Sequence, residues 1–317
     1  MPELSMREAY GRALVEYGAQ NEQVVALDVD TAASTLSQFF AQKYPDRFFN
    51  VGIAEPCMVD VGVGLALGGF IPFINGFASL LALRALEQIR TCVCYARTNV
   101  KIAASYAGLS DFKDGATHYS ITDLSNLRAL PGMTVVVPAD AVQAAAWVPL
   151  AAEFDGPFYL RLSRAGALPA YTAGVPLEIG KGITHRSGRD LTLVACGAMV
   201  GRSLLAAEEL AAQGVDVRVI ELHTLKPLDS ELVIGAAEET GALVTAEEHS
   251  IIGGLGSAVA EVLAEAQPTP LERVGIRDQF CPTGRNLDRL MDTCGLAVAD
   301  ICAAAGRVLR RKETRRS

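Results

Sequence analysis

The stretch "FFNVGIAEPCMVDVGVGLALGGF" (residues 48–70) carries the strongest indication of the fold of this chain. It joins an apolar run of strand-like composition to a glycine-containing apolar segment typical of a buried helix, with Glu55 and Pro56 between them. Proline suits the first turn of a helix, so the pattern predicts that Glu55 lies at or near a helix start. A carboxylate in such an apolar setting needs an explanation.

Glu55 allows a structural and a functional interpretation. At a surface, its charge would complement the positive end of the helix dipole. Its neighbours include Ile53, Met58 and Val59, however, and burial among apolar side chains disfavours a charged carboxylate and raises its affinity for a proton. Carboxylates in such settings are more often functional than structural, so we favour a functional role.

Alternating strand-like and helical segments predict an α/β fold. Apolar, β-rich runs recur through the first half of the chain, at residues 24–29, 70–74, 100–105, 133–138 and 158–162. Such alternation indicates a mostly parallel sheet flanked by helices on both faces. Ligands bind such sheets at the carboxyl ends of the strands, so residues that directly follow a strand become site candidates.

The chain is predicted to contain two domains. The segment from Ser163 to Asp190 is rich in Gly, Pro and Ala and is typical of an inter-domain connection, which puts a boundary near residue 185. Further strand-like runs follow, at residues 191–196, 215–222, 241–248 and 271–276. We therefore expect a first α/β domain over residues 1–185 and a second, smaller α/β domain over residues 186–317.

Composition limits the classes of function. The 317 residues, half of them hydrophobic, can bury two cores, and the net charge of −8 comes with no basic stripe before the tail "RRKETRRS", so we expect no nucleic-acid binding. Seven cysteines without framework or metal-ligand spacing favour reduced thiols and a cytoplasmic location. The charged N-terminus is unlike a signal peptide.

One uncharged segment raises the question of a membrane span. Residues 61–83 contain no charge and are long enough to cross a bilayer. Five glycines, Pro72 and Asn75 interrupt the run and argue for a buried helix, a short strand and a second helix instead. We therefore expect no membrane span.

A glycine-punctuated loop within residues 105–133 gathers further polar candidates. Asp111, Asp114 and His118 lie close together there, and His118 could act as a general acid/base or donate a hydrogen bond to a substrate oxygen. The alternative is a histidine that only ties down backbone carbonyls. The spacing resembles no closed set of metal ligands, and we expect no metal site in this chain.

Three arginines are candidates for binding an anion. Arg7 lies near the start of the chain, and Arg161 and Arg164 follow a strand-like run in "YLRLSR". Guanidinium groups that converge on a cleft suit a phosphate or a carboxylate. For each arginine alone, a surface salt bridge is the more ordinary explanation.

Four segments together resemble one enzyme family: "RFFNVGIAEPCMVDVGVGLALGG", "PFINGFASLLALRALEQIR", "DGATHYSITDLSNLRALPGMTVVVPAD" and "EEHSIIGGLGS". They are similar to the pyrimidine-binding and C-terminal domains of transketolases, particularly the split type made of two subunits. The resemblance covers nearly the whole chain, and "GIAE" and "DGATH" in this order are its most specific parts. It implies that the two predicted domains are a transketolase-like pyrimidine-binding domain and a transketolase C-terminal domain.

The resemblance implies thiamine diphosphate chemistry and gives Glu55 a role. In the family, the matching glutamate hydrogen-bonds N1′ of the cofactor's aminopyrimidine ring and promotes the tautomer whose exocyclic nitrogen removes the thiazolium C2 proton. Phe77 matches the aromatic residue that packs on the pyrimidine, and Asp30 matches an acidic residue near the cofactor. Leu80 stands where an aromatic residue is common, which weakens that wall.

The implied reaction moves a two-carbon ketol unit from a ketose to an acceptor. His118 and Asp114 match residues on the donor sugar, so His118 joins Glu55 as a candidate catalytic residue. The residues that match those holding the terminal phosphate of sugar substrates are Arg7, Ser34 and Arg164. We therefore expect a phosphorylated donor.

Departures from the family pattern point to an unusual donor or acceptor. Tyr106 in "SYAGLS" stands where split transketolases usually have histidine, and Tyr119 follows the "ATH" motif where glutamine is common. Pro56 and Cys57 replace a more usual polar pair. A tyrosine stays neutral at pH 7, so proton transfer or phosphate contact by an imidazole is lost at Tyr106, which we keep as a substrate-binding candidate.

No "GDG…N" signature for a metal-bridged diphosphate occurs in the sequence. The resemblance therefore implies a separate N-terminal transketolase subunit that supplies the diphosphate and Mg²⁺ site, with the cofactor at an interface of an α2β2 assembly. The C-terminal domains would contribute mainly to dimer contacts. Two alternatives stay open. One is the β subunit of a 2-oxoacid dehydrogenase, which acylates a lipoyl group, and the other is a non-catalytic subunit that only stabilises its partner.

Overall fold

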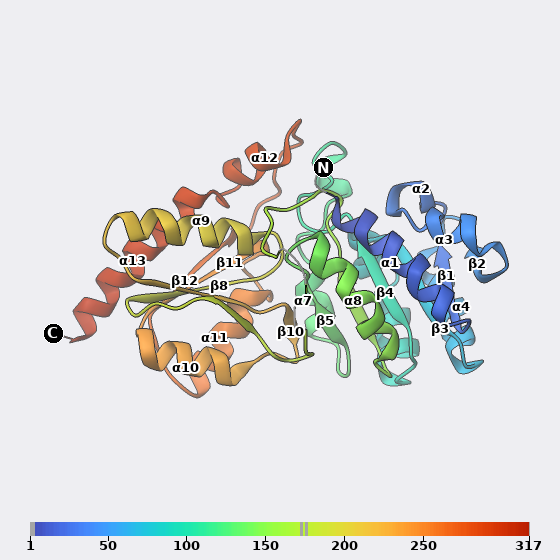
Figure 1. The fold of residues 1–317 in the computed structure, drawn as a ribbon, viewed down its shortest axis with the longest axis horizontal. Coiled ribbons are helices and arrows are strands. Elements are labelled where there is room, and N and C mark those ends of the chain that lie inside the picture. The colour runs from blue at the N-terminus through green and yellow to red at the C-terminus, as the bar shows by residue number, and fades with distance from the viewer. Residues whose placement is uncertain (1–3, 172–173, 175–176, 317) are drawn as a thin grey trace.

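The computed structural model describes residues 4–171, 174 and 177–316, and it consists of two α/β units side by side along the long axis of the molecule (Figure 1). The first unit is built on a seven-stranded sheet with the strand order β10-β5-β6-β4-β3-β1-β2. Its strands are β1 (Val24–Asp28), β2 (Phe48–Asn50), β3 (Ile71–Phe77), β4 (Lys101–Ser105), β5 (Thr134–Val136), β6 (Phe158–Arg161) and β10 (Thr224–Lys226). All pairings are parallel except that of β10 with β5. The predicted α/β class with a mostly parallel sheet is confirmed.

Helices cover both faces of this sheet, because successive residues of a buried strand point to opposite sides. Phe73 of β3 packs with Tyr10 and Trp147 beneath α1 and α8, whereas Ile74 packs on the other face with Leu81 of α5. The helical segments of this unit are α1 (Met6–Gln20), α2 (Ala32–Thr35), α3 (Gln38–Lys43), η1 (Pro45–Arg47), α4 (Glu55–Leu67), α5 (Ala78–Arg84), α6 (Leu86–Gln88), η2 (Ile89–Tyr95), η3 (Gly115–Thr117), α7 (Asp123–Arg128) and α8 (Ala141–Glu153).

The second unit has a five-stranded sheet with the order β12-β11-β8-β9-β7, in which only β7 is antiparallel. Its strands are β7 (Ile183–Arg186), β8 (Leu191–Ala195), β9 (Val217–Glu221), β11 (Leu243–Ser250) and β12 (Leu271–Ile276). Its helices are α9 (Met199–Ala212), α10 (Ser230–Thr240), α11 (Leu255–Glu265), α12 (Leu287–Thr293) and α13 (Val298–Arg316). The predicted second, smaller sheet is therefore present.

The two units share structure across their boundary. Strand β10 comes from the second half of the chain but completes an edge of the first sheet, and Val137 N donates a hydrogen bond to His223 O at 2.8 Å. Residue 185, where we expect the boundary, lies within β7 of the second sheet. One hydrophobic core runs from Ile74 in the first unit to Leu255 in the second. The units are consequently packed together rather than loosely linked.

Helix α4 has the predicted helix–strand–helix context but is not buried all round. Met58, Val59 and Gly62 are buried, whereas Leu67 is 76% exposed and Val61 is also exposed. The expectation of an interior helix is therefore wrong, because apolar composition does not tell a helix inside a domain from one that covers its surface. Within the described part of the chain, no helix combines the length and the apolar character that crossing a bilayer requires.

Two cysteines depart from the expected reduced state. Cys281 and Cys294 form a disulfide, with 6.1 Å between their Cα atoms and a sequence separation of 13. The fold brings them together, which the sequence spacing does not show. The cysteines that are free are Cys57, Cys92, Cys94, Cys196 and Cys302.

Candidate active site

Glu55 is the first residue of α4, as predicted, and its side chain is only 3% exposed. Its carboxylate accepts a hydrogen bond from Arg84 Nη1 at 3.3 Å. Arg84 ends α5 and its side chain is 56% exposed, so water competes with this long contact. Glu55 is thus a buried ionisable group with one weakly held ion-pair partner among the described residues.

Phe77 is the last residue of β3, directly before α5, and its ring contacts the polar loop that follows β4. The Phe77 ring stacks on Tyr106 with 4.2 Å between centroids and an angle of 23° between ring planes. The His118 ring meets Phe77 edge-on at 6.3 Å, and Ser79 Oγ donates a hydrogen bond to His118 O at 2.6 Å. Leu80 is partly buried on the same helix. The structure therefore brings the predicted residues Phe77, Tyr106 and His118 together.

Tyr106 begins the segment that we call the 106–121 loop, and its backbone is strained. Its φ of 63° lies in the left-handed region, which is uncommon for an aromatic residue and typical of functional sites. The side chain is buried, and its hydroxyl accepts a hydrogen bond from Arg7 Nη1 at 3.2 Å. The Arg164 guanidinium carbon lies 5.0 Å from the ring centre. Tyr106 thus contacts Arg7 and Arg164, two of the three arginines predicted to bind an anion.

Arg7, on α1, holds two other segments of the site. Its Nη1 donates to the carbonyl of Ser34 in α2 as well as to the Tyr106 hydroxyl. Its Nε is buried and has no hydrogen-bond partner among the described residues. Because an unpaired buried donor is costly, this N–H fits a ligand that brings an acceptor.

Asp111 determines the balance of charge at the other arginine. Arg164 Nη1 lies 2.9 Å from Asp111 Oδ1. Burial, together with the nearby Asp114, raises the pKa of Asp111 to about 6. At pH 7 the group is still mainly ionised and neutralises Arg164, so the uncompensated positive charge lies mainly on Arg7. Asp114 is exposed, and His118 Nδ1 lies 2.8 Å from Thr117 Oγ1.

Asp30 shares the sheet edge with this cluster but has its own contacts. It follows β1, the neighbour of β3, with a φ of 66°. The side chain is exposed and accepts a hydrogen bond from Asn50 Nδ2 at 3.1 Å. No hydrogen bond joins it to the other predicted site residues in the part of the chain that the structure describes.

Sequence reasoning named Asp111 only as a polar candidate of the loop, missed Arg84 and kept Arg161 as a candidate for anion binding. Asp111 had a local signal, since it lies in the polar loop, whereas nothing in the sequence marks Arg84 as a partner of Glu55. Arg161 neither binds at the surface nor faces the anion-binding cluster. Its Nε lies 2.7 Å from Asp123 Oδ2 in a fully buried ion pair.

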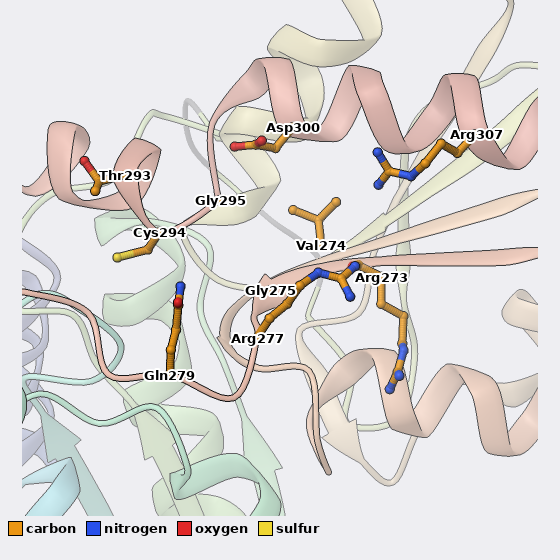
Figure 2. A pocket seen from close by; sticks show the side chains of 10 residues that line it. All are labelled: Arg273, Val274, Gly275, Arg277, Gln279, Thr293, Cys294, Gly295, Asp300 and Arg307. Atoms are coloured by element: carbon orange, nitrogen blue, oxygen red, sulfur yellow. The ribbon is translucent and has the colours of Figure 1, made fainter.

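A cavity of about 590 Å³ lies elsewhere, at the outer edge of the second sheet (Figure 2). Its arginines do not converge, because Arg273 points to the side of β12 opposite Asp300 and Arg307. Arg307 Nε is held by Glu272 at 2.9 Å. None of the predicted site residues lines this cavity, so its size does not make it the active-site candidate.

Comparison with known proteins identifies the family. Residues 2–167 match the family model "Transketolase, pyrimidine binding domain", and residues 180–301 match "Transketolase, C-terminal domain". The chain belongs to the transketolase family. It is 43% identical over 310 residues to the 6-deoxy-6-sulfo-D-fructose transketolase subunit of Clostridium sp. (strain MSTE9), which covers 98% of this chain and 96% of that protein. It is 36% identical over 303 residues to an apulose-4-phosphate transketolase subunit of Phocaeicola vulgatus, covering 95% and 96% of the two chains.

Solved structures agree with this assignment. A structure described as "Split gene transketolase, inactive beta4 tetramer" matches this transketolase-family chain with a TM-score of 0.89 and 46% identity, over 98% of this chain and 99% of that chain. The transketolase from Leishmania mexicana matches with a TM-score of 0.82 at 19% identity, over 98% of this chain and 46% of that chain, which supports the fold alone. The predicted resemblance to the C-terminal subunit of a split transketolase is confirmed.

Proposed function

We propose that this chain is one subunit of a two-component transketolase, which moves a two-carbon ketol unit from a ketose with a terminal anionic group to an acceptor. The observation that carries the proposal is the buried carboxylate of Glu55 at the start of α4, in a chain of this family. Phe77 at the end of β3, Tyr106 after β4 and Arg164 after β6 supply aromatic and cationic side chains suited to bind the substrate.

The residues present fit thiamine diphosphate. When bound, this cofactor supplies a nucleophilic carbon that breaks and forms bonds next to sugar carbonyls. Glu55 would hold a proton against N1′ of the aminopyrimidine ring, because its carboxylate is shielded from water and has only the exposed Arg84 as an ion-pair partner among the described residues. Phe77, of which Tyr106 covers one face, and Leu80 would form the apolar wall, with Asp30 at the same sheet edge.

The polar residues would hold the donor sugar. His118 and Asp114 would bind its hydroxyl groups, and His118 would exchange a proton with the reacting oxygen. Arg7, with Ser34 and Arg164, would bind the terminal anion, and Arg7 has a buried N–H to offer it. The names of the two relatives specify a sulfo group and a phosphate group on the sugar, so we propose either anion as the terminal group.

An exposed apolar face beside Glu55 supports a partner subunit. Ile53, just before α4, and Leu83 of α5 are exposed, Tyr95 at the end of η2 is 87% exposed, and α4 contacts both α5 and η2. Exposed apolar side chains that gather on neighbouring elements are typical of interfaces. We assign the face to an N-terminal transketolase subunit that brings the diphosphate and Mg²⁺ site, in an α2β2 enzyme of the cytoplasm. The similar β4 tetramer is described as inactive, which agrees with a need for that subunit.

Reconstitution tests the proposal. The chain and its N-terminal subunit are mixed with thiamine diphosphate, Mg²⁺ and an aldose phosphate that accepts the two-carbon unit. Release of the new aldose is then measured from fructose 6-phosphate, 6-deoxy-6-sulfofructose and free fructose. We expect turnover of an anionic ketose with both chains and none with either chain alone. Release of CO₂ from a 2-oxoacid would support the dehydrogenase alternative instead, and turnover by this chain alone would contradict the two-chain assignment.

Replacing Arg7 by methionine tests the anion site. In Arg7→Met we expect the KM of the anionic donor to rise about tenfold or more, because a charged hydrogen-bond donor is lost, while free fructose is affected much less. Arg12→Met is the matched control, since Arg12 lies on the same helix in a surface pair with Glu8. Equal losses for charged and uncharged ketoses would contradict the assignment.

A further inference from the structure

The 106–121 loop is held by the second unit as well as by its own. Leu109, Tyr119 and Ile121 lie in the hydrophobic cluster of the second unit, together with residues of β8, β9 and α13. Backbone hydrogen bonds add to this packing, from Gly284 N to Phe112 O at 2.7 Å and from Ser250 N to Ile121 O at 2.9 Å. The segment that carries the sugar-binding candidates is therefore anchored in the second unit's core by three of its apolar residues.

Glu248 of β11 contacts the backbone of the loop directly. Its carboxylate accepts a hydrogen bond from Leu109 N at 2.7 Å, between Tyr106 and Asp111 in the chain. Burial raises the pKa of Glu248 to about 6, so the group is mainly ionised at pH 7 and accepts as a charged group. The loop leaves room for this carboxylate at Gly108. Gly108 has a φ of 61°, and a Cβ there would lie 2.3 Å from the Glu248 carboxyl carbon.

Arg161 links the end of the loop to β11. Its Nη2 donates to Ser120 O at 3.1 Å, at the end of the loop, and to Glu248 O at 3.1 Å. Ser120 N in turn donates to Gly108 O at 2.9 Å, which closes the loop at its base. Leu109 near the start of the loop is thus hydrogen-bonded to β11 directly, and Ser120 near its end is linked to β11 through Arg161.

We propose that Glu248 is a positioning residue of the active site: it fixes Leu109 and thereby Tyr106 and Asp111, which makes the second unit part of the substrate-binding machinery. The inference rests on the proposed function for the identity of the substrate. It goes beyond that function, because a second unit that made only dimer contacts would have no part in binding the donor.

Glu247 offers a matched control within the same strand. Adjacent residues of a strand point to opposite faces, and Glu247 accepts from Leu255 N at 2.7 Å and Gly256 N at 2.8 Å, at the start of α11. It is as buried as Glu248, but its hydrogen bonds to described residues are all made within its own unit. Loss of either carboxylate leaves backbone donors unpaired, so both alanine variants are expected to lose stability.

The test compares these variants in two measurements. In the reconstituted enzyme, Glu248→Ala is expected to raise the donor KM about tenfold with a smaller change in kcat. Glu248→Gln, whose amide oxygen can still accept from Leu109 N, is expected to have a donor KM close to that of the unmodified enzyme. Glu247→Ala is expected to lower the Tm to a similar degree without this change in KM. If Glu248→Ala and Glu247→Ala have the same KM, the proposal is overturned.

Amide hydrogen exchange on the whole chain without substrate separates this inference from the proposed function. Glu248→Ala is expected to speed exchange at Leu109 and Ser120 relative to Glu247→Ala, whichever reaction the enzyme performs. Gly108→Ala tests the same contact from the loop side if Glu248→Ala does not fold, and it is expected to show the same faster exchange. Unchanged loop protection in these variants would overturn the positioning role, whereas changed protection in a chain without transketolase activity would overturn only the proposed function.

Discussion

Replacing Glu55 by glutamine is expected to lower kcat of the reconstituted enzyme about 10²–10⁴-fold, the range for loss of a group that holds or moves a proton. Glutamine preserves the size of the side chain and can form a hydrogen bond, but it cannot share a proton with a ring nitrogen as a carboxylate does. Because this position is buried, bulk water has little access to it and cannot take over the role of the carboxylate. The measurements are steady-state aldose release and the rate of proton exchange at the cofactor's thiazolium carbon.

Glu87→Gln is the control for this experiment, since Glu87 is a surface glutamate of the neighbouring helix α6. We expect it to leave turnover and proton exchange unchanged. Turnover of Glu55→Gln equal to that of the unmodified enzyme would favour the alternative in which this chain only stabilises its partner. A variant that loses turnover but keeps fast proton exchange would show that Glu55 acts in a later step.

The helix start at Glu55 could be predicted from sequence because its determinants are local. Pro56 and the apolar periodicity lie within one turn of it. The same holds for His118 and Tyr106, which lie in or beside a polar loop just after a strand. These features depend on residues a few positions apart, which is what sequence patterns record.

The partners of these residues could not be predicted, because they come from distant segments. Arg84 lies 29 positions from Glu55, and Glu248 lies 139 positions from Leu109. Strand β10 joins the first sheet from the second half of the chain. Apolar composition also gives no information on whether the outer face of α4 is covered by this chain or by another one.

The buried pair of Arg161 and Asp123 is expected to give the largest change in stability. Replacing Arg161 by methionine leaves Asp123 buried without its counter-charge, which costs about 3–5 kcal/mol. The guanidinium contacts both carboxylate oxygens, at 2.7 and 3.2 Å, and Tyr159 donates a further hydrogen bond at 2.8 Å. Urea unfolding followed by the fluorescence of Trp147, the only tryptophan in the chain, measures the loss.

The pH dependence and the double variant distinguish a charge effect from a packing effect. Burial alone would raise the pKa of Asp123, but the Arg161 guanidinium outweighs it and holds that pKa below its usual range. The pair therefore contributes stability above about pH 4, the ordinary value for aspartate, and loses it as the pH falls through the lower folded value. In Arg161→Met the pKa of Asp123 rises, so mild acid protonates it, and we expect the loss of stability to shrink between pH 7 and about pH 5.

Asp123→Asn combined with Arg161→Met should restore much of the stability, because no unpaired charge is then buried. Arg189→Met, at an exposed pair with Asp216, is the control and should change the stability by less than about 0.5 kcal/mol. A deficit that is independent of pH and persists in the double variant would mean that packing, rather than the buried charge, accounts for the role of Arg161.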